Sequence, residues 1–167
     1  MKKILSLTLA LAMLGTALTG CGSKDAASQT SAESTQQTVP VRREQSQAEK
    51  VLALINTFAT GDTDTARSLL SDGYIQHNLA YGTGADAFIG SVEYLASADV
   101  KTTVNNIRAF EDGDKVFLQT IYNFAGAGEQ VAFDIFRFDE NGKIAEHWDV
   151  METIADQSTW QNQNGKF

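Results

Sequence analysis

The sequence predicts an α+β fold in which helices come first in the chain and pack on one face of a curved antiparallel sheet. Apolar residues recur at helical spacing from Ser46 to Ala98. After Ala98 they alternate with polar residues, and short connectors that contain glycine separate four such segments. Helices followed by strands that tight turns join are typical of this class.

The first helix is predicted to begin at a capping box formed by Ser46 and Glu49. Apolar residues then follow at i, i+3, i+4 and i+7, which places them on one helix face. Gly61 ends this helix. The residues of the apolar stripe are Val51, Leu54, Ile55 and Phe58.

Two further helices are expected before the sheet. The second is short, carries Ala66, Leu69 and Leu70, and stops before the Asp72-Gly73 pair. Residues 74–78 form a short extended piece. Thr83 and Asp86 suggest the capped start of the third helix. Its stripe consists of Phe88, Val92 and Leu95.

Four strands are predicted over residues 101–110, 115–124, 129–138 and 143–153. The connectors between them read Glu-Asp-Gly-Asp, Ala-Gly-Ala-Gly and Asp-Glu-Asn-Gly. Loops of this length join neighbouring antiparallel strands, so the four strands are expected to form a meander.

The first twenty residues have the layout of a cleaved export signal. Lys2 and Lys3 precede an apolar run from Ile4 to Leu18, which is too short for a comfortable membrane span. The run leads into Leu-Thr-Gly-Cys, and this Cys21 is the single cysteine of the chain. The tetrapeptide resembles the lipobox of bacterial lipoproteins, which implies cleavage before Cys21 and lipidation of its thiol. Several acyl chains on one residue would hold the protein at a membrane, in the cell envelope outside the cytoplasm.

The composition sets the expected domain boundaries and excludes some partners. Residues 21–45 are polar, contain Pro40 and lack apolar periodicity, so they are expected to be a flexible tether. The domain then spans residues 46–156, and a polar tail, to which Trp160 could add a docking contact, covers residues 157–167. The net charge is −8, and it becomes −10 once Lys2 and Lys3 leave with residues 1–20. An acidic chain of this kind is a poor candidate for binding nucleic acid.

Two segments carry a resemblance to a known family. These are Tyr-Ile-Gln-His-Asn at residues 74–78 and the block Asp-Ile-Phe-Arg-Phe-Asp-Glu-Asn-Gly-Lys-Ile-Ala-Glu-His-Trp-Asp-Val at residues 134–150. Together they resemble the SnoaL-like polyketide cyclase group of the nuclear-transport-factor-2-like superfamily. The resemblance implies a cone-shaped, cystatin-like barrel with a cavity between sheet and helices. The superfamily includes isomerases, cyclases, dehydratases, epoxide hydrolases and proteins without catalysis.

Strand alternation predicts a polar cluster on one sheet face. A four-residue loop at 139–142 would place Asp134 opposite His147, and a two-residue Asn-Gly turn would place it opposite Asp149. Both keep Asp134, Phe136, His147 and Asp149 on one face, whereas a three-residue bulged loop would not. A loop at 125–128 would likewise place Gln119 beside Asp134 and Asn123 beside Gln130. Phe117, Ile121, Phe136 and Met151 are expected to surround this row.

The resemblance implies roles for these residues. The acid after tryptophan acts as the acid/base residue in related cyclases and isomerases, which points to Asp149. Asp134 and His147 would orient it or share its proton, and His77 would bind a substrate oxygen from the helix side. The substrate-binding set is Gln119, Asn123, Phe136, Tyr74 and Met151. For Asp134 and His147, a satisfied buried pair that only orders the sheet is the alternative.

Three functions stay open at this point. The first is cofactor-independent isomerase, cyclase or lyase chemistry, with a proton removed next to the carbonyl of a small hydrophobic molecule. The second is binding of such a molecule without turnover. The third is interaction, including a homodimer through the outer sheet face, where Trp148 is expected. Two histidines seventy residues apart give no metal-binding pattern, so neither a metal nor a cofactor is predicted.

Overall fold

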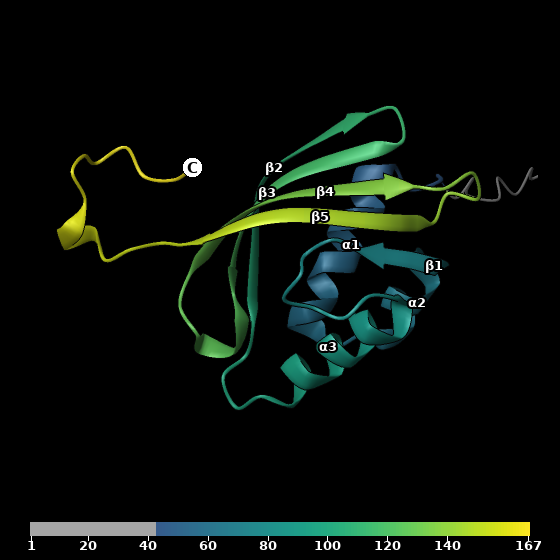
Figure 1. The fold of residues 1–167 in the computed structure, drawn as a ribbon, viewed down its shortest axis with the longest axis horizontal. Helices are drawn as coiled ribbons and strands as arrows, with labels where there is room; N and C mark the ends of the chain where they lie inside the picture. Colours follow the sequence, from purple (N-terminus) through teal and green to yellow (C-terminus); the bar gives the residue numbers. More distant parts are fainter. Residues whose placement is uncertain (1–42) are drawn as a thin grey trace, which may run out of the picture. The chain divides into compact units, whose positions relative to one another are not determined.

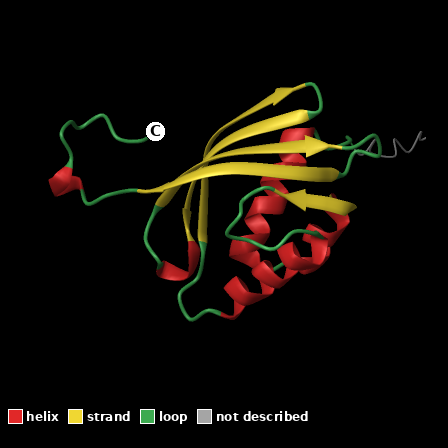
Figure 2. Ribbon diagram, in the orientation of Figure 1, coloured by secondary structure: helices red, strands yellow, loops and turns green. Residues whose placement is uncertain are grey.

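The computed structural model describes residues 43–167, in which three helices lie on one face of a five-stranded sheet (Figure 1). The helices are α1 (Gln47–Thr60), α2 (Thr63–Leu69) and α3 (Ala85–Ser97). The strands are β1 (Leu70–Gln76), β2 (Thr103–Asp112), β3 (Lys115–Asn123), β4 (Gln130–Phe138) and β5 (Ile144–Thr153). Their order is β1-β5-β4-β3-β2, and all neighbours are antiparallel except β1 and β5. The α+β class and the four predicted strands are confirmed (Figure 2).

The first helix begins and ends as predicted. The Ser46 side chain accepts a hydrogen bond from the Glu49 backbone, and the Glu49 side chain accepts one from the Ser46 backbone. Gly61 follows in the left-handed region at φ 75° and donates its backbone N–H to Thr57. A Cβ built on Gly61 would lie 2.8 Å from the Cβ of Ala96 in α3, so glycine also permits the close approach of α1 and α3.

The predicted cap of the third helix is wrong. Helix α3 starts from Gly84 without a side-chain cap, and Asp86 points to Arg67 instead. The Thr83 hydroxyl accepts a hydrogen bond from the backbone of Gln76, at the end of β1. The Thr83 hydroxyl is therefore used in a contact with β1 and does not cap α3.

Strand β1 is the element that differs most from the prediction. Leu70 belongs to this strand rather than to the second helix, and the extended piece predicted at 74–78 overlaps its last three residues. The strand pairs in parallel with β5, and Gln76 lies opposite His147. A glycine and two polar residues in its first half weaken the strand signal in the sequence, and pairing with β5 compensates for it.

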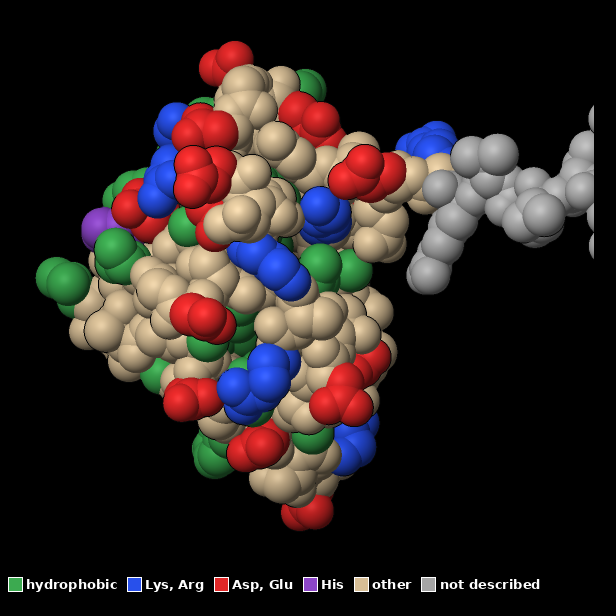
Figure 3. All heavy atoms as spheres, turned by 90° about the vertical axis from the view of Figure 1, so that its right-hand side faces the viewer, with side chains coloured by type: hydrophobic (Ala, Val, Ile, Leu, Met, Phe, Trp, Pro, Cys, Tyr) green, Lys and Arg blue, Asp and Glu red, His purple; other side chains and the backbone are tan. Residues whose placement is uncertain are grey.

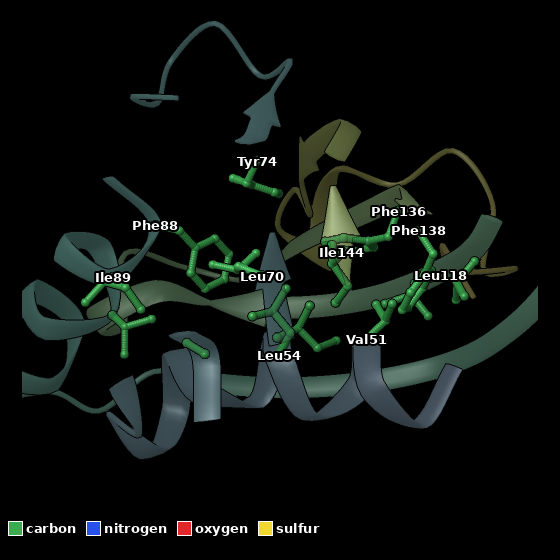
Figure 4. Packing of buried hydrophobic residues seen from close by; sticks show 14 of the residues in the cluster. Val51, Leu54, Leu70, Tyr74, Phe88, Ile89, Leu118, Phe136, Phe138 and Ile144 are labelled. Atoms are coloured by element: carbon green, nitrogen blue, oxygen red, sulfur yellow. The ribbon is translucent and has the colours of Figure 1, made fainter. Parts of the chain in front are cut away.

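The core lies between the helices and the inner sheet face (Figure 4). Val51 and Leu54 of α1 are fully buried, as are Phe136 of β4 and Ile144 of β5. Phe88 of α3 packs edge-on against Tyr74 of β1. The apolar stripes of α1 and α3 thus meet the alternate positions of the strands, as their spacings predicted.

The C-terminal tail is held to the outer sheet face. The Trp160 indole donates to the carbonyl of Ala155. The amide of Gln119 in β3 donates to the carbonyl of Lys166, whose ammonium group contacts Glu152 of β5. The tail therefore returns to the sheet.

No helix within residues 43–167 is long and apolar enough to cross a membrane. At the end of the domain that faces right in Figure 1, acidic and basic side chains are interspersed (Figure 3). The predicted signal peptide at 1–20, the lipidated Cys21 and most of the predicted tether lie outside the described residues.

Candidate functional site

A cavity of about 680 Å³ lies between the helices and the inner sheet face. This volume is within the range of small-molecule sites. Much of the wall is apolar and comes from α1, α3, the segment after β3, and β5. It includes Ile55, Phe58, Phe88, Leu95, Phe124 and Met151. Tyr81 and Tyr94 line it as well and are exposed.

Asp134, His147 and Asp149 form the polar part of the cavity wall. Asp134 of β4 pairs directly with Asp149 of β5, which is the pairing expected for a two-residue Asn-Gly turn. The loop itself is longer, since the backbone N–H of Asp139 donates to the carbonyl of Lys143. A bulge lies between the pairs Arg137–Glu146 and Phe138–Ile144, and it accommodates the one extra residue of β5, Ala145. Since paired positions share a face, both carboxylates and the imidazole point to the helices.

Asp134 and His147 are buried, at 3% and 8% exposure, and they contact each other. The distance from His147 Nε2 to Asp134 Oδ1 is 3.1 Å. The hydroxyl of Tyr122 donates to the other oxygen of Asp134 at 3.2 Å. The ring of Phe136 stacks on the imidazole with centroids 4.3 Å apart, which fixes the plane of the ring.

Asp149 is half-buried and is oriented by Asn78. The side-chain amide of Asn78 lies 2.7 and 3.0 Å from the two oxygens of Asp149. This donor comes from the segment after β1 and reaches the same cavity wall. Asp149 thus has a hydrogen-bond partner different from that of Asp134, although the two residues are direct neighbours in the sheet.

Two buried tyrosines supply neutral hydroxyl groups. Burial, and after it the negative charges of Asp149 and Asp134, raises the pKa of Tyr74 far above its ordinary value of 10.0. Burial and the charge of Asp134 raise the pKa of Tyr122 in the same direction. Both hydroxyls therefore stay protonated and can donate. Tyr122 donates to Asp134, whereas Tyr74 only accepts, from Gln76 at 3.4 Å.

Within residues 43–167, the side chains of Asp134, His147 and Asp149 lie close enough together to share a metal ion. One ligand atom from each of Asp134, His147 and Asp149 lies within 4.8 Å of the others. Carboxylates and imidazole suit Zn²⁺ or Mn²⁺. In the structure, each group already has a hydrogen-bond partner.

Six of the predicted site residues line the cavity. For the five residues in β4 and β5 the prediction depended on strand parity, and that parity is correct. The six residues are Tyr74, Asp134, Phe136, His147, Asp149 and Met151.

The predicted placement of Gln119 and Asn123 is wrong. Leu118 pairs with Asp134 and Gln119 pairs with Phe133, which is one residue away from the predicted register. The connector between β3 and β4 contains the 3-10 turn η1 (Phe124–Gly126) and is longer than the assumed four residues. A one-residue slip reverses every side chain of a strand. Gln119 therefore faces outward with Phe117 and Ile121, and Asn123 accepts a hydrogen bond from Gly128 in the connector.

His77 does not reach the cavity either. Its ring stacks on Trp148 with centroids 4.5 Å apart and an angle of 5° between the planes. Trp148 alternates with His147 and Asp149, so this stack lies on the outer sheet face. His77 continues strand β1, and its backbone N–H donates to the carbonyl of His147. The predicted approach of His77 to the cavity from the helix side is therefore wrong.

Three residues of the site were missed: Gln76 and Tyr122, which line the cavity, and Asn78, which contacts Asp149. Alternation along residues 74–78 would have grouped Tyr74, Gln76 and Asn78 on one face, had this segment been treated as an edge strand. For Tyr122, the missing information was the register of β3 against β4.

Solved structures with the same fold come from several bacteria. A nuclear-transport-factor-2-like protein of unknown function from Cytophaga hutchinsonii is 17% identical, with a TM-score of 0.57 over 66% of this chain and 94% of its own. An epoxide hydrolase of the LEH-like type from M. tuberculosis is 19% identical, with a TM-score of 0.56 over 64% and 82%. A cystatin-fold protein from Novosphingobium aromaticivorans is 14% identical, with a TM-score of 0.57 over 64% and 99%. At these identities the likeness concerns the fold alone.

No curated protein sequence matches the chain. The family model of the SnoaL-like domain matches residues 51–147, which is more than half of the chain and reaches from α1 to the imidazole of the cavity. The region includes β1, β4 and the first residues of β5 up to His147, and Asp149 lies just beyond it. The chain belongs to the SnoaL-like domain family.

Proposed function

We propose that this protein binds a small hydrophobic carbonyl compound in the cavity and catalyses cofactor-independent proton transfer on it. The observation that carries the proposal is the meeting of two carboxylates and an imidazole inside a mostly apolar cavity of about 680 Å³. Apolar walls favour a hydrophobic ligand, and the polar end fixes its orientation. The reaction class is that of an isomerase, cyclase or lyase.

Asp149 acts as the base in this proposal. It lines the cavity, and Asn78 holds both of its oxygens in place. A carboxylate in this position removes a proton from the carbon next to the carbonyl, and the negative charge moves to the carbonyl oxygen. The Tyr74 hydroxyl, whose hydrogen is not engaged in the described contacts, donates to that oxygen.

The test uses 2-tetralone, a hydrophobic ketone with acidic α-protons, in D₂O. Saturation-transfer NMR measures its binding, and mass spectrometry measures deuterium uptake. We expect the wild-type protein to accelerate uptake and Asp149→Asn, which keeps the shape and one of the two oxygens that Asn78 contacts, to abolish the acceleration. Glu93→Gln, on the exposed side of α3, is the control for lost charge.

One result contradicts catalysis and another contradicts the role of Asp149. Binding with uptake at the rate of the buffer supports a ligand-binding protein without turnover. Equal acceleration by wild type and Asp149→Asn assigns the base to another group.

We further propose that the domain is anchored by lipid at Cys21, outside the cytoplasm of a bacterium. The support is the sequence of residues 1–21, with its basic start, apolar run and Leu-Thr-Gly-Cys end. Expressed in a bacterial host fed an alkyne-labelled fatty acid, the full chain should acquire the label and sediment with membranes. Cys21→Ser should lose both properties, and Ser23→Ala should keep them. Label on Cys21→Ser would refute the anchor.

A second candidate function is self-association through the outer sheet face. Phe110, Phe117, Phe133 and Val150 are 61%, 37%, 56% and 73% exposed. The register places the two pairs Phe110–Phe117 and Phe133–Val150 on the same face. A patch of this kind can pair with itself about a two-fold axis, so the partner is a second copy of the chain.

Light scattering on a concentration series tests this candidate. We expect a dimer that Phe133→Lys dissociates and that Leu79→Lys, at a fully exposed apolar residue elsewhere, leaves intact. A monomer at all concentrations would rule out the dimer.

A further inference from the structure

The orientation of the Gln76 side chain is fixed by a backbone group. The backbone N–H of Asn78 donates to Gln76 Oε1 at 2.9 Å. A backbone N–H can only donate, so the amide oxygen, and not the amide nitrogen, must face it. The reversed orientation would bring two donors together.

The same oxygen determines the tautomer of His147. His147 Nδ1 lies 3.1 Å from Gln76 Oε1, opposite it in the parallel pairing of β1 and β5. The oxygen cannot donate, so the hydrogen of this contact belongs to Nδ1. A neutral imidazole with its hydrogen on Nδ1 has a lone pair on Nε2.

That lone pair would face a carboxylate oxygen. Nε2 lies 3.1 Å from Asp134 Oδ1, and the other oxygen of Asp134 already accepts from Tyr122. Neutral His147 and ionised Asp134 would have no hydrogen between them, and both groups are buried. Stacking on Phe136 restricts rotation of the ring out of this contact.

We infer that Gln76 and Asn78 lock a shared proton between Asp134 and His147. The pair is then neutral as a whole, either as imidazolium with carboxylate or as imidazole with carboxylic acid. Asp149 is the carboxylate outside this neutral pair. Asn78 links both parts, because its backbone orients Gln76 while its side chain holds Asp149.

This inference deepens the proposed function, since it separates a base from a proton-holding pair in the same cavity. Asp134 and Asp149 lie at paired positions of β4 and β5, but Asp134 contacts His147 whereas Asp149 contacts Asn78. These different partners assign the shared proton to Asp134 and the role of the base to Asp149. Gln76 and Asn78 are thus positioning residues.

The experiment is a long-range ¹H–¹⁵N correlation spectrum of the full chain labelled with ¹⁵N-histidine. The chain has two histidines, and exposed His77 serves as an internal reference. We expect hydrogen on His147 Nδ1 in wild type. We expect the same in Gln76→Glu, which keeps an oxygen acceptor. Gln76→Met has a similar size but no acceptor, so His147 should move its hydrogen to Nε2 and donate to Asp134.

Hydrogen on Nε2 with a bare Nδ1 in the wild-type protein would overturn the inference, and so would an unchanged tautomer in Gln76→Met. A His147 signal that shifts when EDTA removes a bound metal would assign the position between Nε2 and Asp134 to that metal. The spectrum needs no turnover, so the result is independent of the 2-tetralone assay. If Gln76→Met does not fold, the wild-type and Gln76→Glu spectra still show which nitrogen of His147 carries the hydrogen.

Discussion

Replacement of Asp134 tests how its contacts contribute to stability. In Asp134→Asn, the amide N–H can donate to His147 Nε2 and the amide oxygen can accept from Tyr122, as the protonated acid would. We therefore expect it to lower the free energy of unfolding by less than about 1 kcal/mol. Asp134→Ala leaves two buried groups without partners, at about 1–3 kcal/mol each. Water that enters the adjacent cavity can satisfy part of this, so we expect a loss of about 2–4 kcal/mol.

Urea denaturation followed by far-UV circular dichroism measures both variants. The midpoint should fall strongly for Asp134→Ala and slightly for Asp134→Asn, with an unchanged m-value. Equal losses for the two variants would refute the reasoning, because the asparagine would then fail to replace the hydrogen bonds. A matching loss in His147→Ala, and no further loss in the double variant, would show that the two residues act as one unit.

Three further predictions follow from the structure. Tyr74→Phe should slow the Asp149-dependent deuterium uptake by about 10- to 100-fold, the effect of one hydrogen bond to a developing charge, while the urea midpoint changes little. Burial raises the pKa of Tyr74 and Tyr122 above 10.0 in the folded protein, so the unfolded chain releases these protons at a lower pH than the folded one. The stabilisation from the two protonated tyrosines should therefore be fully present below pH 10. Above pH 10 the free energy of unfolding should fall by up to about 1.4 kcal/mol per pH unit for each tyrosine. Urea midpoints between pH 9 and 11 should fall less steeply for the Tyr74→Phe/Tyr122→Phe variant, and an equal slope would contradict this. Gly61→Ala should lower the free energy of unfolding by about 1–2 kcal/mol, since the new Cβ would stand at φ 75° and only 2.8 Å from the Cβ of Ala96. An unchanged melting temperature would show that α1 and α3 can move apart.

The helices and four of the strands could be predicted because local physics decides them. The capping box at Ser46, the helical spacing of Val51, Leu54 and Ile55, and the alternation along β4 and β5 are confirmed. For the same reason, Asp134, His147 and Asp149 could be placed on one face before the loop between their strands was known.

The rest depended on contacts between distant segments. The length of the connector between β3 and β4 set a register that turned Gln119 outward and Tyr122 inward. The pairing of β1 with β5 placed Gln76 against His147 and turned His77 to the outer face.

By itself, the sequence determined the class of fold and the parity of the last two strands, because periodicity and turn chemistry act over a few neighbouring residues. Only the tertiary structure decided which donor meets which acceptor in the cavity. Sheet register depends on how whole strands pair, and a single residue of slip exchanges the two faces of a strand. Hence the contacts of Gln76 with His147 and of Asn78 with Asp149, which complete the polar cluster, follow from the pairing of β1 with β5.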